Sequence, residues 1–164
     1  MPFQTTVINR FQPNGVVGEL AFEGPSRSLS YTLNTATEIN NSIGRAFTTS
    51  EEGIAAAGGT DLFAGILVDP KSYAYAGLIE TNPSGETYAL NGSNVSLLEM
   101  GMIYVKLPAA AAIGDYVVYA TATGVLSTVV DPLVPGAGNV LVPNAVVYGF
   151  TVAEAGLACI KLTN

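Results

Sequence analysis

The chain has 164 residues, no histidine and no tryptophan, and its net charge at pH 7 is −7. Hydrophobic residues make up 49% of it and charged residues only 12%, about half the share of an ordinary globular domain. The lack of histidine excludes Ser-His-Asp and Cys-His catalytic sites, and the shortage of charge argues against a free-standing domain with a fully solvated surface.

Most patterned segments alternate between apolar and polar residues with a period of two, which is typical of half-buried β-strands. Residues 61–68 are apolar on both faces, which predicts a central strand. Gly124 is expected at the turn of a hairpin over residues 115–127. In chain order, the predicted strands cover residues 16–22, 28–32, 61–68, 102–107, the two arms of 115–127, 146–152 and 157–162.

Helical signals are weak. The best segments, 51–57 and 109–112, are much shorter than the average helix of about 11–12 residues and are bounded by glycine or proline. The 18 glycines and nine prolines divide the chain into pieces of strand length. These patterns predict an all-β fold, a single antiparallel β-barrel or β-sandwich domain with long loops over residues 16–164.

Residues 1–15 fit this pattern less well, and two interpretations stay open. The segment is either an ordinary edge strand or an extended arm that adds to a neighbouring subunit, with Phe3 and Phe11 as anchors.

The sequence offers little catalytic or metal chemistry. No phosphate-binding loop, dinucleotide-binding motif or calcium-binding loop occurs, and the lone Cys159 is interpreted as an inert core residue. Paired carboxylates could serve a glycosidase, but the sequence forces no pairing among the candidates. We therefore expect no enzyme, no metal and no cofactor. The carboxylates considered are Glu51, Glu52, Asp61, Asp69 and Asp115.

The basic residues are scattered singly, so no patch is available to neutralise phosphates, and we expect neither nucleic acid nor a membrane as partner. The apolar segment after Pro108 is interrupted by Asp115, whereas a membrane-spanning helix needs about 20 apolar residues. The six basic residues are Arg10, Arg27, Arg45, Lys71, Lys106 and Lys161.

Short segments in a fixed order, spread over most of the chain, carry a resemblance to a known family. They are Gly18-Glu19-Leu20-Ala21-Phe22-Glu23-Gly24-Pro25, Gly44-Arg45-Ala46-Phe47-Thr48, Gly58-Gly59-Thr60, Phe63-Ala64-Gly65-Ile66-Leu67-Val68-Asp69-Pro70-Lys71, and Gly114-Asp115-Tyr116-Val117-Val118-Tyr119 with Thr123-Gly124. Together they resemble the structural cement (capsid decoration) proteins of tailed bacteriophages. Asp69 departs from the asparagine expected before the Pro-Lys pair and leaves the turn chemistry intact.

The resemblance implies a β-rich protein added to the outside of a capsid lattice, often as trimers that bridge neighbouring capsomers. The acidic net charge agrees with an exterior location, because a wall that faces packaged DNA gains nothing from negative charge. The partners expected are therefore the major capsid protein and the chain itself, as a homotrimer.

We expect the assembly contacts in the amino-terminal segment and in the loop 69–76. The alternative function is a non-catalytic carbohydrate- or receptor-binding module of a virion, for which the aromatic residues would form the platform. The candidate contact residues are Phe3, Arg10, Phe11, Lys71, Tyr73 and Tyr75.

Overall fold

The computed structural model describes residues 15–22, 24–69, 79–81 and 85–163. Within these ranges the chain is built from β-strands and one 3₁₀ turn, so the prediction of an all-β fold is confirmed. The elements are β1 (Arg27–Leu33), η1 (Glu38–Asn40), β2 (Ala46–Glu51), β3 (Ile54–Ala57), β4 (Leu62–Leu67), β5 (Ile79–Thr81), β6 (Thr87–Ala89), β7 (Asn94–Leu107), β8 (Tyr116–Ala120), β9 (Leu126–Val129), β10 (Asn139–Tyr148) and β11 (Gly156–Thr163).

The first lobe is a small closed barrel. Its strands follow the order β1-β3-β2-β4-β7, and a further pairing between β1 and β7 closes the ring. Antiparallel pairing dominates, as predicted, but β1 and β3 run parallel where Thr32 faces Ile54. Strands β5 and β6 form a separate two-stranded ribbon.

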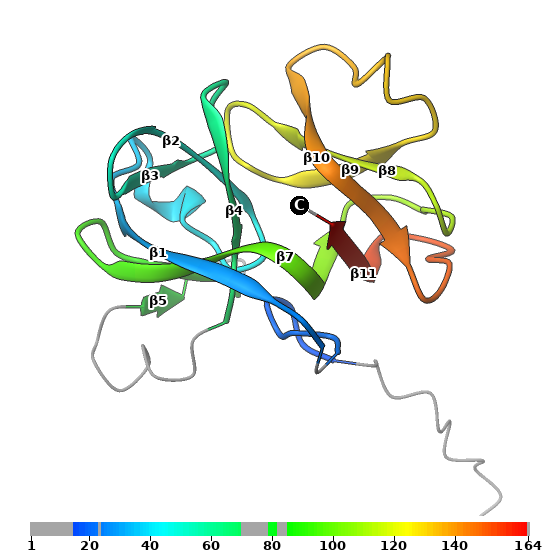
Figure 1. Ribbon diagram of the computed structural model, residues 1–164, viewed down its shortest axis with the longest axis horizontal. Helices are drawn as coiled ribbons and strands as arrows, with labels where there is room; N and C mark the ends of the chain where they lie inside the picture. The colour runs from blue at the N-terminus through cyan, green and yellow to red at the C-terminus, as the bar shows by residue number, and fades with distance from the viewer. Residues whose placement is uncertain (1–14, 23, 70–78, 82–84, 164) are drawn as a thin grey trace, which may run out of the picture.

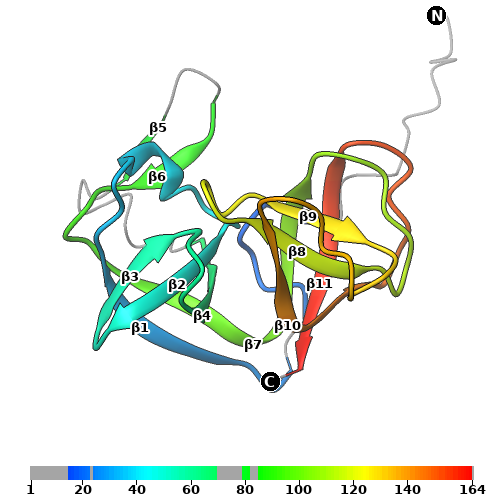
Figure 2. The ribbon, with the colours of Figure 1, turned by 90° about the horizontal axis from the view of Figure 1, so that it is seen from above.

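The second lobe continues the same sheet in the order β7-β11-β10-β8-β9. Strand β7 is 14 residues long and runs through both lobes, which lie side by side along it (Figures 1 and 2). Its first part pairs with β1 and β4, and its second part pairs with β11 from Met100 to Leu107. The predicted hairpin over 115–127 is present as β8 and β9.

A wall of three strands separates two hydrophobic cores. Successive residues of a strand point to opposite faces, so a strand with a core on each side needs adjacent apolar residues. Strands β2, β4 and β7 each supply such a pair, with the first residue in the core of the second lobe and the next in the core of the barrel. The pairs are Ala46-Phe47, Ile66-Leu67 and Leu97-Leu98, the last in reverse order. This is the reason that residues 61–68 read as apolar on both faces.

Strand β4 crosses β7 very closely within this wall. A Cβ atom at Gly65 would lie 2.8 Å from the carbonyl oxygen of Leu98 and 2.9 Å from the Cβ of Leu97, and its φ is 142°. Only glycine fits so close an approach between two backbones.

Two strand predictions were wrong in extent. Residues 16–22 form no strand: the Glu19 N–H donates to the Val16 carbonyl over 3.0 Å, and this turn leaves only an isolated bridge between Leu20 and Ile103. The alternation of this segment therefore reflects a turn rather than a strand. The segment predicted over 146–152 ends as a strand at Tyr148, and Val152 instead bridges Ala111.

The two lobes also meet at a backbone contact between the turn after β3 and the β8–β9 turn. The N–H of Ala46 donates to the Gly124 carbonyl over 2.9 Å, and the N–H of Gly59 donates to the Thr121 carbonyl over 2.7 Å. A Cβ atom at Gly124 would collide with the Ala46 carbonyl oxygen, and one at Gly58 with that of Thr121.

We expect Gly124→Ala to destabilise the protein much more than Gly53→Ala. Both glycines have a left-handed backbone, with φ of 72° and 74°, so alanine costs about 1–2 kcal/mol at either site. At Gly124 the added methyl group also forces the lobes apart, and overpacking of this kind costs about 1–3 kcal/mol more.

Urea unfolding of both variants measures the difference. Gly53 is the matched control, because nothing lies within 4 Å of a Cβ atom built there. Equal free energies of unfolding for the two variants would show that the lobe contact is not tight.

Candidate assembly surfaces

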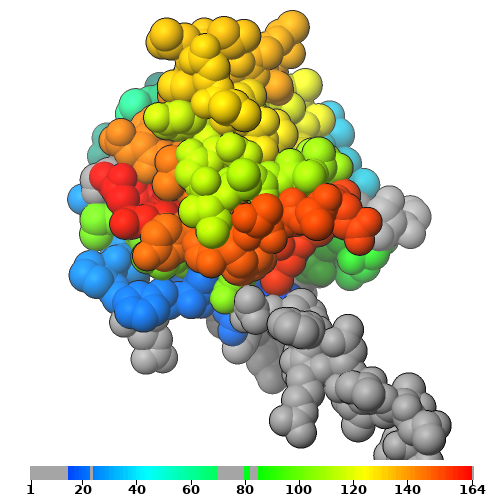
Figure 3. Space-filling view, turned by 90° about the vertical axis from the view of Figure 1, so that its right-hand side faces the viewer, coloured from blue at the N-terminus to red at the C-terminus, as the bar shows by residue number. Residues whose placement is uncertain are grey.

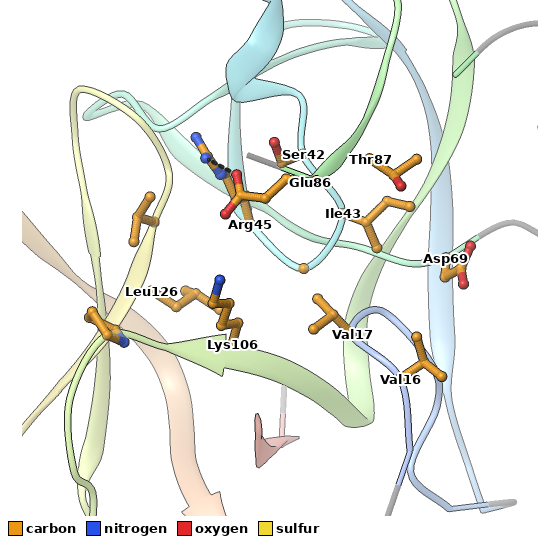
Figure 4. A pocket seen from close by; sticks show the side chains of 14 residues that line it. Val16, Val17, Ser42, Ile43, Arg45, Asp69, Glu86, Thr87, Lys106 and Leu126 are labelled. Atoms are coloured by element: carbon orange, nitrogen blue, oxygen red, sulfur yellow. Dashed lines mark hydrogen bonds and ion pairs between the residues drawn. The ribbon is translucent and has the colours of Figure 1, made fainter. Parts of the chain in front are cut away.

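A cleft of about 560 Å³ lies between the two lobes. Its walls combine apolar side chains with a few charged ones, and they come from distant parts of the sequence (Figure 4). Residues 16 and 17 form one side, the segment before β2 forms the roof in this view, and the ends of β7 and β9 form the other side. The residues used below are Val16, Val17, Ile43, Arg45, Glu86, Lys106 and Leu126.

Arg45 ties the cleft together from the first lobe. Its guanidinium donates to Asn40 Oδ1 at 2.9 Å and to the Thr123 carbonyl of the β8–β9 turn at 3.2 Å. It also forms an ion pair with Glu86 at 3.0 Å, and its side chain is only 16% exposed. Because these partners come from three segments, Arg45 positions both lobes around the cleft.

Lys106 presents a free ammonium group in the same cleft. It is exposed at the end of β7, and no ion pair, hydrogen bond or ring contact engages it within the described residues. The other described cations are engaged: Arg27 pairs with Glu99, Arg45 with Glu86, and the Lys161 ammonium lies 5.2 Å from the centroid of the Tyr148 ring.

The segment that forms one wall of the cleft is held along β7. The Gly18 N–H donates to the Tyr104 carbonyl over 2.7 Å, and the Ala21 N–H donates to the Met102 carbonyl over 2.8 Å. The segment therefore occupies the edge of β7 that β1 covers farther along the strand, up to Met100.

The predicted contact residues all lie outside the described residues, so their roles remain predictions. They are Phe3, Arg10, Phe11, Lys71, Tyr73 and Tyr75. The structure does place the two points at which their segments join the fold. The first segment precedes Gly15 and the second follows Asp69, and the Asp69 N–H donates to the Gly18 carbonyl over 2.8 Å. Both predicted contact segments thus leave the fold beside the cleft, which Val16 and Asp69 help to line.

The most exposed large apolar side chains lie in the loop between β9 and β10. Val130 is 83% exposed, Leu133 87% and Val134 65%. This loop, in yellow and orange, stands out from the body of the molecule (Figure 3). A stable monomer rarely presents such side chains together, so the 130–134 loop is a candidate contact surface.

A second, smaller hollow of about 300 Å³ lies where β7 and β11 meet the residues before β1. Its lining is mainly apolar and includes Phe22, Met100, Met102 and Leu162. Phe22 and Leu20, both in the segment wrongly predicted as a strand, are exposed beside β7.

These surfaces carry no recognisable catalytic chemistry. Among the described residues, no group of three or more histidine, cysteine, aspartate or glutamate side chains could hold a metal ion. Cys159 is buried as predicted, and burial raises the pKa of its thiol, so the reactive thiolate is disfavoured. The described part of the chain also contains no helix with the length and apolar character needed to cross a bilayer.

The aromatic residues do not form a sugar-binding platform in the described regions. The ring contact found there joins Phe63 to Tyr119 at 6.2 Å between centroids, and Tyr119 is buried. This pair belongs to core packing, as most of the aromatic residues were expected to.

The sequence patterns did not predict the cleft or the 130–134 loop as contact surfaces. The loop carries a local signal, because large apolar residues stand among Asp131, Pro132 and Pro135, which are typical of exposed turns. The cleft carries none, since its residues are far apart in the sequence.

Comparison with known proteins identifies the family. The model of a family described as "Structural cement protein (E217 gp24/Pam3 gp6)" matches residues 3–163. The chain belongs to this structural cement protein family. Membership implies a structural, non-catalytic role, in agreement with the absence of histidine.

A solved structure shares the fold. A chain from "The capsid of Myoviridae Phage XM1" superposes with a TM-score of 0.64 and 16% sequence identity, covering 100% of this cement protein and 99% of that chain. Among curated proteins no match is found.

We expect Arg45→Ala to lower the free energy of unfolding of this cement protein by about 1.5–3 kcal/mol, the range for hydrogen bonds to charged groups. Arg27→Ala is the matched control: its side chain is 53% exposed and its ion pair with Glu99 is at the surface, where such pairs contribute about 0–1 kcal/mol. Urea titrations at low and high salt measure both. Equal losses would show that Arg45 does not join the lobes.

Proposed function

We propose that this cement protein binds the outside of an assembled phage capsid and bridges neighbouring subunits of the major capsid protein. Its place in the virion, on the capsid, and its stabilising structural role follow from its family, and the family match over residues 3–163 carries the proposal. The bridging, the exterior face and self-association as a homotrimer are the finer parts proposed here.

The composition and the surface support these finer parts. The chain exposes large apolar side chains in several places, and contacts with other proteins would cover them. The net charge of −7 favours the exterior over the side that faces packaged DNA. The alternative of a carbohydrate-binding module gains no support from the described aromatic residues.

The physical mechanism is linkage. A protein that binds only the assembled lattice stabilises that state by RT ln(1 + [L]/Kd), which is about 2.7 kcal/mol per site when its free concentration is 100 times the dissociation constant. No catalysis is needed, and a chain with bare chemistry and apolar surface suits this task.

We propose that the two segments beside the cleft supply contacts to the lattice. The residues are Phe3, Arg10 and Phe11 before the fold, and Lys71, Tyr73 and Tyr75 in the loop after Asp69. Because Gly18 and Asp69 are hydrogen bonded at 2.8 Å, both segments leave the same region of the surface. One contact area on the lattice could therefore receive both.

Adding the purified protein to DNA-filled capsids that lack it should raise the temperature at which they release DNA. Binding to filled particles requires an exterior site, and the linkage above supplies the stabilisation. The fluorescence of a DNA-binding dye during heating measures the release. An unchanged release temperature at saturating protein would contradict the proposed function.

Deleting residues 2–12 should abolish binding to capsids and leave the melting temperature of the free protein nearly unchanged. The deleted segment precedes the first described residue, Gly15, and both hydrophobic cores lie after it. Co-sedimentation with capsids measures binding, and circular dichroism measures melting. Loss of the fold in this variant would reject the arm and favour the edge-strand interpretation.

A further inference from the structure

The cleft between the lobes has the features of a site for an acidic segment with apolar neighbours. Its volume of about 560 Å³ lies in the range of ligand pockets, about 300–1,000 Å³. Apolar side chains such as Val17, Ile43 and Leu126 line it, and Lys106 adds an unengaged positive charge.

The other charges of the cleft leave Lys106 available. Glu86 and Arg45 neutralise each other through their ion pair at 3.0 Å. Asp69 lies on the opposite side of the cleft from Lys106, near Val16 (Figure 4). A carboxylate that enters on the side of β7 and β9 would therefore meet the ammonium group of Lys106.

The 130–134 loop of this same protein has the matching chemistry. Asp131 stands between Val130, Leu133 and Val134, which include the two most exposed large apolar side chains of the described residues. The loop is also held in shape, because Asp131 Oδ1 accepts the Leu133 N–H at 2.9 Å and the Asp131 carbonyl accepts the Val134 N–H at 3.2 Å. A preorganised loop loses little conformational entropy when it binds.

A loop cannot reach the cleft of its own chain. Strand β9 begins at Leu126, which lines the cleft, and ends at Val129, just before the loop. Its pairing with β8, from Tyr116–Val129 to Tyr119–Leu126, holds these two ends apart by the length of an extended strand. The occupant must therefore come from a second copy.

We propose that the 130–134 loop of one copy docks in the cleft of the next, with the Asp131 carboxylate against the Lys106 ammonium and Val130, Leu133 and Val134 against the apolar walls. This inference deepens the self-association part of the proposed function and does not depend on capsid binding. Asp131 Oδ1 keeps its hydrogen bond to Leu133, and Oδ2 faces the lysine.

The contact joins two different surfaces, so it is heterologous. Contacts of this kind close into rings when the rotation between copies allows it, whereas identical patches give two-fold dimers. A closed trimer is one such ring. The loop-and-cleft contact thus supplies a physical basis for a cyclic homo-oligomer.

The test is a charge exchange read out by sedimentation velocity over a range of protein concentrations. Lys106→Glu and Asp131→Lys should each raise the dissociation constant of the oligomer at least about tenfold, because each places like charges together. The double variant, Lys106→Glu with Asp131→Lys, should recover association. Wild-type and unrecovered single-variant mixtures should associate with each other less than the two single variants do when mixed.

Two further variants separate charge from loop structure. Asp131→Asn keeps an oxygen that accepts the Leu133 N–H but removes the charge, so it should still weaken association. Asp61→Lys is the matched control, because Asp61 also neighbours an exposed apolar residue, Leu62, but lies outside the loop and the cleft. It should leave association unchanged, and unchanged melting temperatures should show that every variant is folded.

A monomeric wild-type protein, single variants that associate like wild type, or a double variant that does not recover would each overturn the inference. Co-sedimentation with capsids is measured separately. A wild-type oligomer that recovers after charge exchange supports the loop-and-cleft contact, and its failure to bind capsids would count against the proposed function alone.

Discussion

The fold depends on a three-stranded wall with a hydrophobic core on each side. Strands β2, β4 and β7 each place one apolar residue in the core of the barrel and the adjacent one in the core of the second lobe. Such a wall tolerates no polar residue on either face, because a buried polar group without a partner costs free energy. Gly65 is the point at which the wall is thinnest, since β4 and β7 approach there without room for a side chain.

The same wall accounts for the cleft. Two lobes that share long strands diverge on either side of them, and the space between the lobes is closed only where other contacts bridge it. The glycine contact at Gly58 and Gly124 forms one bridge, and Arg45 forms another through Asn40, Thr123 and Glu86. Lys106 remains at the open part of the cleft.

Several elements could be predicted from the sequence because their signals are local. The alternation of β7 around Ile103, the two-sided apolar run of β4 and the glycine turn between β8 and β9 all describe neighbours along the chain. The segment 16–22 was misassigned because a turn that includes Gly18 produces the same alternation as a strand. Strands β2 and β3 were missed because glutamates, alanines and glycine give a short segment no clear period.

The composition alone determined that this chain lacks the usual catalytic groups and has more apolar surface than charge to cover it, and local patterns determined an all-β chain of a recognisable family. Only the tertiary structure decided which distant residues meet: that Arg45 reaches Thr123 and Glu86, that Lys106 is left unengaged, and that the segments before Gly15 and after Asp69 leave the fold together. The reason is that periodicity and turn chemistry act over a few residues, whereas these contacts join segments tens of residues apart, which only the packed sheet brings into register.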